Sequence, residues 1–484
     1  MTPPAPAGGP PPRRRRRGLV AVLASVLVLI AAAAGVAVFR PGPVAGWLGA
    51  ADPDREAADS TEPAPPPVLA PAAANAPLPS TSGLTAALGP LVGKPVLGDQ
   101  VHVSVVDVAT GQDLYDRQPG TPTVPASVTK VLTAATVLAA RGPAYRIPTR
   151  AVAGAAPGEV VLVGGGDPTL AAGANGFYPG AARLDQLAEQ VKRALGGTAP
   201  TKVTVDGSLY SGPVFGPGWD SDIPTGGFGG AITALMIDGA RTDPRAGEGY
   251  APRSATPDLA AGRAFARALG LPAAAVAKGT APPAANSSPG AAPVPGAELG
   301  RVESPPMARL VDVMLGQSDN IVAEALARQV ALARNQPASF DGGAAAMKTV
   351  LGELGLPADE ATLSDASGLS RNNRISPELL TKVFVLAGNG SHPQLAGIFG
   401  GLPVAGWSGT LNERFKGGAA SAAGVVRAKT GTLTGVHAVS GVVTTVDGRL
   451  LAFAVLADHV PSDLEQARPA LDDIVAKLAG CGCR

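Results

Sequence analysis

Three short polar motifs, widely separated in a chain of 484 residues, constrain this sequence more than any other feature. They are Ser127-Val-Thr-Lys130, Ser318-Asp-Asn320 and Lys429-Thr-Gly431. Each motif alone occurs by chance in a chain of this length. Together they supply a hydroxyl nucleophile, two amines, a second hydroxyl and an amide. A fold that brings the three together would therefore hold a complete set of groups for acyl transfer, with no need for a histidine.

The first motif pairs a serine with a lysine three residues later. The run from Pro125 to Leu138 has the apolar pattern and the entering proline of a helix, and residues i and i+3 share a helix face. The lysine amine would therefore reach the serine hydroxyl. Lysine serves as a base only if burial or a neighbouring cation lowers its pKa. Ser127 is a candidate nucleophile and Lys130 its candidate base, but Ser-x-x-Lys also occurs by chance in most long chains.

The second motif has two readings. Ser318 and Asn320 lie two residues apart in a short connection between predicted helices, so their side chains would point the same way. A hydroxyl there would relay a proton, and an amide would orient a substrate. The alternative is an ordinary helix N-cap before Ile321, because Ser, Asp and Asn are the best capping residues.

The third motif lies on a predicted strand. Lys429 offers positive charge, and Thr430 and Thr432 offer hydroxyls, a combination that suits a terminal carboxylate. Gly431 would let a substrate backbone approach the strand edge, since it has no side chain. A second lysine near Lys130 would also help to keep that amine neutral. The alternative is a strand that contains these residues by chance.

No histidine stands in a recognisable catalytic context. The chain has no Gly-x-Ser-x-Gly elbow and no His-Glu-x-x-His metal motif. Two of its four histidines, His102 and His437, fall in predicted strands and are expected to be packed or surface residues. The lysine-based scheme gains by this elimination, and we predict neither a metal nor a cofactor.

The N-terminus predicts export. Five arginines, Arg13 to Arg17, precede the 22 uncharged residues of Gly18–Phe39, enough to span a bilayer at about 1.5 Å per residue. Arginines stay on the cytoplasmic side, so we predict a cytoplasmic tail at 1–17, a transmembrane signal-anchor at 18–39 and an extracytoplasmic body. A cleaved signal peptide is the alternative. If the five arginines are left out, the chain has 34 basic and 38 acidic residues. We therefore expect no nucleic-acid partner.

Composition and hydrophobic periodicity divide the rest of the chain into segments. Residues 40–80 form a Pro- and Ala-rich linker, and a hairpin follows at 101–117. Helical periodicity brackets a region of short strands and glycine turns, so we predict a catalytic domain from 81–150 and 301–480 with a β-rich insertion at 151–300. The end of the chain predicts three strands and a closing helix: 424–429, 436–445, 450–456 and 463–478.

Two cysteines, Cys481 and Cys483, stand at the extreme C-terminus. In an exported protein they would close a local disulfide or pair with another chain. The simpler expectation is a mobile tail that does little.

These motifs resemble those of the class C low-molecular-mass penicillin-binding proteins, the D-alanyl-D-alanine carboxypeptidase/endopeptidase family. The likeness covers roughly residues 85–478 and extends to four further runs: Gly164–Leu170, Gly216–Trp219, Asp365–Pro377 and Gly409–Leu411. It implies an α/β (α+β) penicillin-recognising serine transpeptidase/β-lactamase-like catalytic domain with a β-rich inserted region. The implied activity is removal of the terminal D-alanine from peptidoglycan stem peptides through an acyl-enzyme, with cleavage of cross-links as a second activity and β-lactam antibiotics as inhibitors.

The resemblance also implies roles for particular residues. Ser127 would be acylated, Lys130 would be its base, and Ser318 would relay the proton. Backbone N–H groups of Ser127 and Thr432 would form the oxyanion hole. The residues implied to bind the substrate amide and terminal carboxylate are Asn320, Lys429, Thr430, Gly431 and Thr432. Those implied to read the diaminopimelate end of the stem peptide are Trp219, Asp222, Arg371, Leu433 and Thr434.

Two positions depart from or qualify this pattern. Trp219 has an alternative role as a packing anchor in a Gly-rich loop. An aromatic that relatives place after the aspartate is not evident, because Gly226-Gly-Phe-Gly-Gly230 occupies that stretch.

Spacing separates the enzymes that share these motifs. Ser127 and Ser318 are 191 positions apart, far more than a compact β-lactamase needs. A class A β-lactamase also carries Glu-x-x-Leu-Asn after its Ser-Asp-Asn, whereas Glu353 is followed by Leu-Gly-Leu. The group that would deacylate penicillin is therefore missing. The alternatives are a β-lactamase or esterase on the same fold, and a non-catalytic cell-wall binding protein.

Overall fold

The computed structural model describes residues 76–247, 250–287, 292–461 and 464–483. The chain divides into two compact units, Met1–Val68 and Leu69–Arg484, and every described residue belongs to the second. The predicted tail and anchor, and most of the predicted linker, lie outside the described residues. Within the described ranges, no helix is both long enough and apolar enough to cross a membrane.

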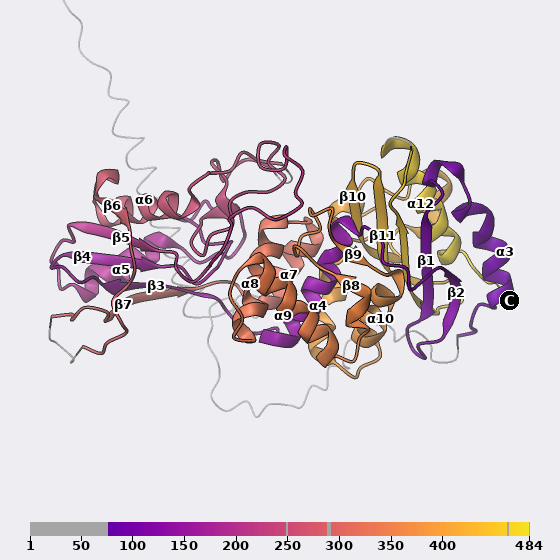
Figure 1. Ribbon diagram of the computed structural model, residues 1–484, viewed down its shortest axis with the longest axis horizontal. Helices are drawn as coiled ribbons and strands as arrows, with labels where there is room; N and C mark the ends of the chain where they lie inside the picture. Colours follow the sequence, from indigo (N-terminus) through magenta and orange to yellow (C-terminus); the bar gives the residue numbers. More distant parts are fainter. Residues whose placement is uncertain (1–75, 248–249, 288–291, 462–463, 484) are drawn as a thin grey trace, which may run out of the picture. The chain divides into compact units, whose positions relative to one another are not determined.

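A five-stranded antiparallel sheet joins the two ends of the described chain (Figure 1). Its strands are β1 (Val101–Asp107), β2 (Asp113–Arg117), β10 (Val426–Leu433), β11 (Val436–Thr444) and β12 (Leu450–Ala457). Their order is β10-β11-β12-β1-β2, so β10 lies at one edge. The predicted hairpin and the three predicted C-terminal strands are confirmed.

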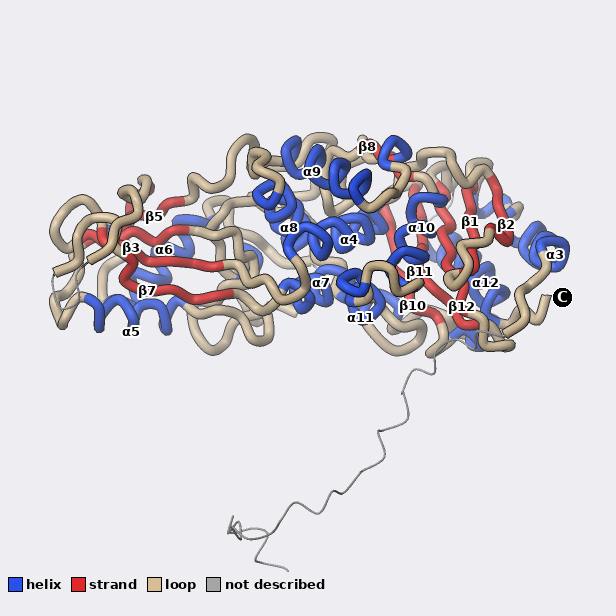
Figure 2. The backbone as a smooth tube through the Cα atoms, turned by 90° about the horizontal axis from the view of Figure 1, so that it is seen from below, coloured by secondary structure: helices blue, strands red, loops and turns tan. Residues whose placement is uncertain are grey.

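Helices cover both faces of this sheet. Successive side chains of a strand point to opposite faces, and apolar residues occur on both. On β12, Phe453 and Val455 pack with the helices α3 (Thr81–Val92) and α12 (Leu464–Ala479). The intervening Ala454 and Leu456 belong to the core on the opposite face. On that side Ser104 of β1 shares a hydrogen bond of 3.0 Å with Thr381 of α10 (Pro377–Gly388). The sheet is therefore the middle layer between two groups of helices (Figure 2).

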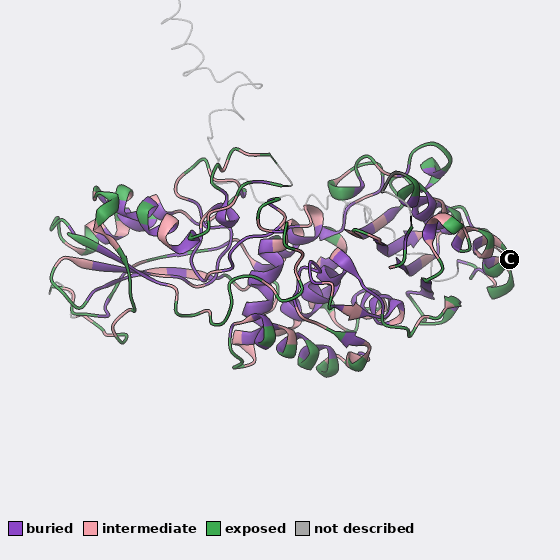
Figure 3. Ribbon diagram, turned by 45° about the horizontal axis from the view of Figure 1, so that its top comes forward, coloured by how far each residue is buried: buried purple, intermediate pink, exposed green. Residues whose placement is uncertain are grey.

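The helix α4 (Thr129–Arg141) runs through the larger helical layer and is buried from Thr129 to Leu138 (Figure 3). Its neighbours are α7 (Met307–Gly316), α8 (Asn320–Ala333), α9 (Phe340–Glu353) and α11 (Gly397–Gly401), and a two-stranded sheet, β8 (Ala361–Thr362) with β9 (Arg374–Ile375), lies nearby. The buried threonines of α4 are satisfied: Thr133 Oγ1 donates to Ala366 O at 2.7 Å. A helix with paired polar groups can be buried on all sides.

The region between the two parts of this body forms a second five-stranded sheet of order β6-β5-β4-β3-β7. Its strands are β3 (Pro148–Ala153), β4 (Glu159–Val163), β5 (Lys202–Asp206), β6 (Val276–Lys278) and β7 (Glu298–Glu303). Two helices, α5 (Leu184–Ala194) and α6 (Pro257–Leu269), share its core. We expected a β-rich region, and the two helices are an addition to that expectation.

The C-terminal tail packs against α3. Cys481 and Cys483 are bonded to each other, and Cys481 is only 3% exposed. The N–H of Ser80, the N-cap of α3, donates to Cys483 O at 2.6 Å. The expectation of a mobile tail is wrong, because the tail is a hydrogen-bonded part of the outer helical layer.

Candidate active site

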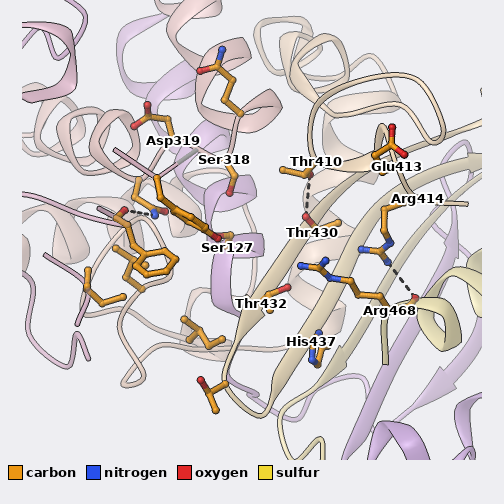
Figure 4. Close-up of a pocket in the computed structure, with 18 of the residues that line it drawn as sticks. Ser127, Ser318, Asp319, Thr410, Glu413, Arg414, Thr430, Thr432, His437 and Arg468 are labelled. Carbon is orange, nitrogen blue, oxygen red and sulfur yellow. Dashed lines mark hydrogen bonds between the residues drawn. The ribbon is translucent and has the colours of Figure 1, made fainter. Parts of the chain in front are cut away.

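Three elements bring the three motifs to one cavity of about 1020 Å³ (Figure 4). Ser127 lies in the single 3-10 turn Ala126–Val128 that precedes α4. Ser318 lies between α7 and α8, and Thr430 and Thr432 lie on the edge strand β10. The side chains of these four residues line the cavity. The tertiary structure therefore brings together motifs that lie 191 positions apart, from Ser127 to Ser318, and 111 positions apart, from Ser318 to Lys429.

The amine of Lys130 has three hydrogen-bond acceptors and no exposure to solvent. It donates to Ser127 Oγ at 3.0 Å, to Asn320 Oδ1 at 2.6 Å and to Ser367 O at 2.6 Å. Burial lowers the pKa of Lys130 to about 8, against the opposing effect of nearby carboxylates, chiefly Asp365. A buried amine with this pKa can be neutral near physiological pH and take a proton from a serine.

Ser127 does not lie in the helix that we predicted from Pro125 to Leu138. The helix begins at Thr129, and Ala126 before the serine has φ of 48°, which interrupts a continuous helix. The spacing still works, because a 3-10 turn has about three residues per turn and places residues i and i+3 one above the other. The prediction of the contact is confirmed, and the prediction of the local structure is wrong.

Gly431 makes room for this turn, and our expectation that it makes room for substrate needs correction. A Cβ on Gly431 would lie 2.6 Å from Pro125 O and 3.1 Å from Ser127 N. Gly368, with φ of 83°, presses on the turn as well, since its Cβ would lie 1.8 Å from Ala126 O. The backbone that carries Ser127 is therefore held between two glycines.

Both roles that we predicted for the second motif occur, but in different residues: one caps a helix, and the other two face the cavity. Asp319 is the N-cap of α8, and its Oδ1 accepts from the N–H groups of Ile321 and Val322. Asn320 is the first residue of the helix; its Oδ1 accepts from Lys130, and its Nδ2 donates to Phe228 O at 2.8 Å. Ser318, with φ of 56°, and Asn320 both line the cavity.

On β10, the two threonines face the cavity, whereas the lysine points inward. Lys429 is fully buried, and its Nζ donates to Thr430 O at 2.8 Å. Burial and the positive charge of Lys130 hold the pKa of Lys429 well below its usual value. The repulsion that we expected to keep Lys130 neutral is therefore seen at Lys429, and burial is the largest influence on both amines. Thr430 Oγ1 donates to Thr410 Oγ1 at 3.0 Å.

A buried carboxylate supports the loop that holds Lys130. Glu324 Oε1 accepts from the N–H groups of Ala366 and Ser367, at 3.0 and 2.8 Å, and Ser367 O in turn accepts from Lys130. Its partner charge is Arg328, 3.5 Å away and equally buried. Burial and the neighbouring Asp365 raise the pKa of Glu324 to about 7. No sequence motif marks Glu324, because its role depends on a loop 42 residues further along the chain.

The five residues predicted for the side pocket do not all line the cavity. Asp222, Leu433 and Thr434 line the cavity. Arg371 Nε donates to both carboxylate oxygens of Asp220 at 2.9 Å, and its Nη1 donates to Thr434 O at 3.1 Å. Arg371 therefore braces the end of β10 from outside the cavity lining.

Trp219 also lies outside the cavity lining. Its Nε1 donates to Asp365 Oδ2 at 2.8 Å, and its ring packs edge to face on Phe340 at 5.7 Å. The alternative reading of Trp219 as a packing anchor describes these contacts.

Sequence reasoning missed several residues of the cavity wall. Phe228, which we set aside within its glycine-rich stretch, lines the cavity beside Asp222, and its ring lies 4.0 Å from that of Tyr250. The signal was present, since Phe228 follows Asp222 by six positions. His437 and Arg468 also line the cavity, but nothing in their local sequence distinguishes them from packed or surface residues.

Comparison with known proteins agrees with this site. The D-Ala-D-Ala carboxypeptidase 3 (S13) family profile matches residues 84–266 and 246–478. A carboxypeptidase of Mycobacterium tuberculosis is 41% identical over 437 residues, 88% of this chain and 90% of the relative. Carboxypeptidase DacB of Mycolicibacterium smegmatis is 39% identical over 439 residues, 88% of this chain and 92% of the relative.

The fold has a match among solved structures. Penicillin binding protein 4 (dacB) from Haemophilus influenzae superposes with a TM-score of 0.64 at 23% identity, over 83% of this chain and 98% of that one. The predicted α/β penicillin-recognising fold and the predicted family are both confirmed. The chain belongs to the D-Ala-D-Ala carboxypeptidase 3 (S13) family and is a serine-type D-Ala-D-Ala carboxypeptidase.

Proposed function

We propose that Ser127 attacks the carbonyl carbon of the terminal D-alanyl-D-alanine bond in peptidoglycan stem peptides, with Lys130 as its base. The hydrogen bond of 3.0 Å between the two side chains carries this proposal. Neutral Lys130 takes the proton of Ser127 Oγ as the new C–O bond forms. The backbone N–H groups of Ser127 and Thr432 would bind the oxyanion.

The second half of the reaction needs a proton donor and a water molecule. Ser318 Oγ would relay the proton from Lys130 to the leaving amine as the C–N bond breaks, which leaves Lys130 neutral again. Water would then attack the acyl-enzyme with Lys130 as base, and the bond between the acyl carbon and Ser127 Oγ would break as the proton returns to Ser127. Asn320 would orient the peptide amide, and Thr430 and Thr432 would receive the carboxylate. The size of the cavity, about 1020 Å³, supports cleavage of a cross-linked peptide as a second activity.

The substrate's location agrees with the expected export. The uncharged run Gly18–Phe39 after Arg13–Arg17 supports a single N-terminal anchor that leaves the body at the outer face of the membrane, where peptidoglycan lies. Domain boundaries of 81–150 and 301–480 for the catalytic body, with an insertion at 151–300, agree with a second sheet that begins at Pro148 and ends at Glu303.

Labelled penicillin tests the proposed nucleophile. The soluble body should form a stable covalent adduct, visible by intact mass, and Ser127→Ala should form none. Release of D-alanine from a pentapeptide then tests the substrate. Rapid turnover of the drug would instead favour a β-lactamase, and the absence of any adduct in the wild type would contradict both enzymes and leave a binding protein.

The rate of acylation should rise with pH through about 8. Lys130 acts only when neutral, and its pKa is lowered from 10.5 to about 8 by burial, so about one tenth is neutral at pH 7. The second-order rate constant for penicillin adduct formation, measured from pH 6 to 10, should gain tenfold per pH unit at the acid end and level off above about pH 8. A rate that is flat across this range would exclude Lys130 as the base.

A further inference from the structure

Arg468 is a cation in the cavity wall, and the nearby Asp472 attracts it electrostatically. Arg468 on α12 is exposed, and among the described residues its guanidinium makes no hydrogen bond and no ion pair. Its neighbour Arg414 is fully engaged, because Nε and Nη2 of that residue bind the carboxylate of Asp472 at 2.6 to 3.1 Å. Figure 4 shows the Arg468 side chain extending from its helix toward the strand that carries Thr430 and Thr432.

The register of the sheet places this guanidinium near the two threonines. His437 on β11 pairs directly with Thr432 on β10, so their side chains share one face, and Thr430 lies on the same face two residues earlier. Burial and, after it, the positive charges of Arg468 and Arg414 together lower the pKa of His437 to about 4. Arg468 is therefore within electrostatic reach of the residue that pairs with Thr432.

The other cation expected at this place is not available to a substrate. Lys429 has no exposed surface, and its Nζ donates to the carbonyl of Thr430 inside the fold. The two threonine hydroxyls that face the cavity are therefore left with Arg468 as a neighbouring positive charge. A charged donor makes shorter and stronger hydrogen bonds to a carboxylate than hydroxyl donors alone.

We propose that Arg468 binds the carboxylate on the carbon next to the scissile nitrogen of the substrate, together with Thr430 and Thr432. This inference rests on the proposed function and assigns the charge in its carboxylate site to α12 in place of the lysine of β10. A guanidinium can donate two parallel hydrogen bonds to a carboxylate, which also fixes the orientation of that group. Penicillin, which carries a carboxylate, would use the same contact.

The test compares two substrates that differ only in this charge. One is a peptide that ends in D-alanyl-D-alanine as the free acid, and the other is the same peptide with a C-terminal amide. In Arg468→Gln, kcat/KM for the free acid should fall about tenfold, the effect of one charge-assisted hydrogen bond, while kcat/KM for the amide changes less than about twofold. Arg468→Lys should restore part of the preference for the acid.

Matched controls separate this effect from general damage. Arg193 on α5 is also an exposed arginine, so Arg193→Gln should leave both rates unchanged. The pKa of His437, followed by NMR, should rise in Arg468→Gln, because a repelling charge is removed. Arg468 makes no side-chain hydrogen bond or ion pair with the described residues, so the variant should fold; if it does not, Arg468→Lys carries the same comparison of acid with amide.

The outcomes distinguish the inference from the function on which it rests. An equal loss on both substrates, or no loss on either, would overturn the role of Arg468 and leave the carboxypeptidase intact. A wild-type protein that releases no D-alanine from the free acid and forms no adduct at Ser127 would overturn the proposed function itself.

Discussion

Replacement of Lys130 by methionine should slow acylation of Ser127 by at least about a thousandfold, the upper part of the range for a lost general base. Methionine fills a similar volume but cannot accept a proton, and no other amine lies within reach of Ser127 Oγ among the described hydrogen bonds. The measurement is the second-order rate constant for penicillin adduct formation, read by intact mass.

Lys348→Met on α9 is the control for this variant. Lys348 is an exposed lysine on a helix that carries none of the motif residues, so its loss should leave acylation unchanged. Lys130→Met also leaves Asn320 Oδ1 and Ser367 O without a donor, so its melting temperature should be measured beside the rate. Acylation of a folded Lys130→Met at a near wild-type rate would mean that another group activates the serine.

Replacement of Gly431 by alanine should lower kcat about a hundredfold, because a displacement of about 1 Å at a nucleophile has an effect of this size. The new Cβ would lie 2.6 Å from Pro125 O and 3.1 Å from both Ala126 Cβ and Ser127 N, so the turn that holds Ser127 must move. The measurement is kcat and KM for D-alanine release from a pentapeptide.

Gly352→Ala is the matched control, since a Cβ on that α9 residue would meet nothing within 4 Å. It should leave kcat unchanged and stabilise the helix slightly. The same experiment tests our corrected reading of Gly431. A rise in KM with kcat unchanged would mean that the glycine serves the approach of substrate, as the sequence first suggested.

The predictable parts of the fold depended on local patterns. The apolar run at 450–456 and the largely apolar run at 436–445 predicted β12 and β11, because such runs are typical of strands that are buried on both faces. The two helices of the second sheet, α5 and α6, were missed within a region rich in glycine turns. The signal for α5 was present, since Leu184, Leu187 and Val191 have the i, i+3, i+7 spacing of an amphipathic helix and pack in the core of the second sheet.

The residues of the candidate site also divide into those that the sequence predicted and those that it did not. Ser127 and Lys130 could be named from their spacing, whereas Ser318 and Asn320 needed the resemblance that the three motifs carry together. Arg468 could not be named, because an arginine in an amphipathic C-terminal helix has no local feature that distinguishes it from a solvated one. Its significance depends on the packing of α12 beside β11 at the cavity wall.

The three motifs by themselves predicted the chemistry, a serine nucleophile with a lysine base, and their spacing predicted a large insertion between the first two motifs. The tertiary structure decided the state of each group. It removed Lys130 and Lys429 from water, placed Ser127 in a tight turn against Gly431, and brought Arg468 to the wall of the cavity. Burial and close packing arise from contacts between residues hundreds of positions apart, and these contacts set the pKa values and the accessible charges. A motif specifies which atoms are present, but only the fold sets their surroundings.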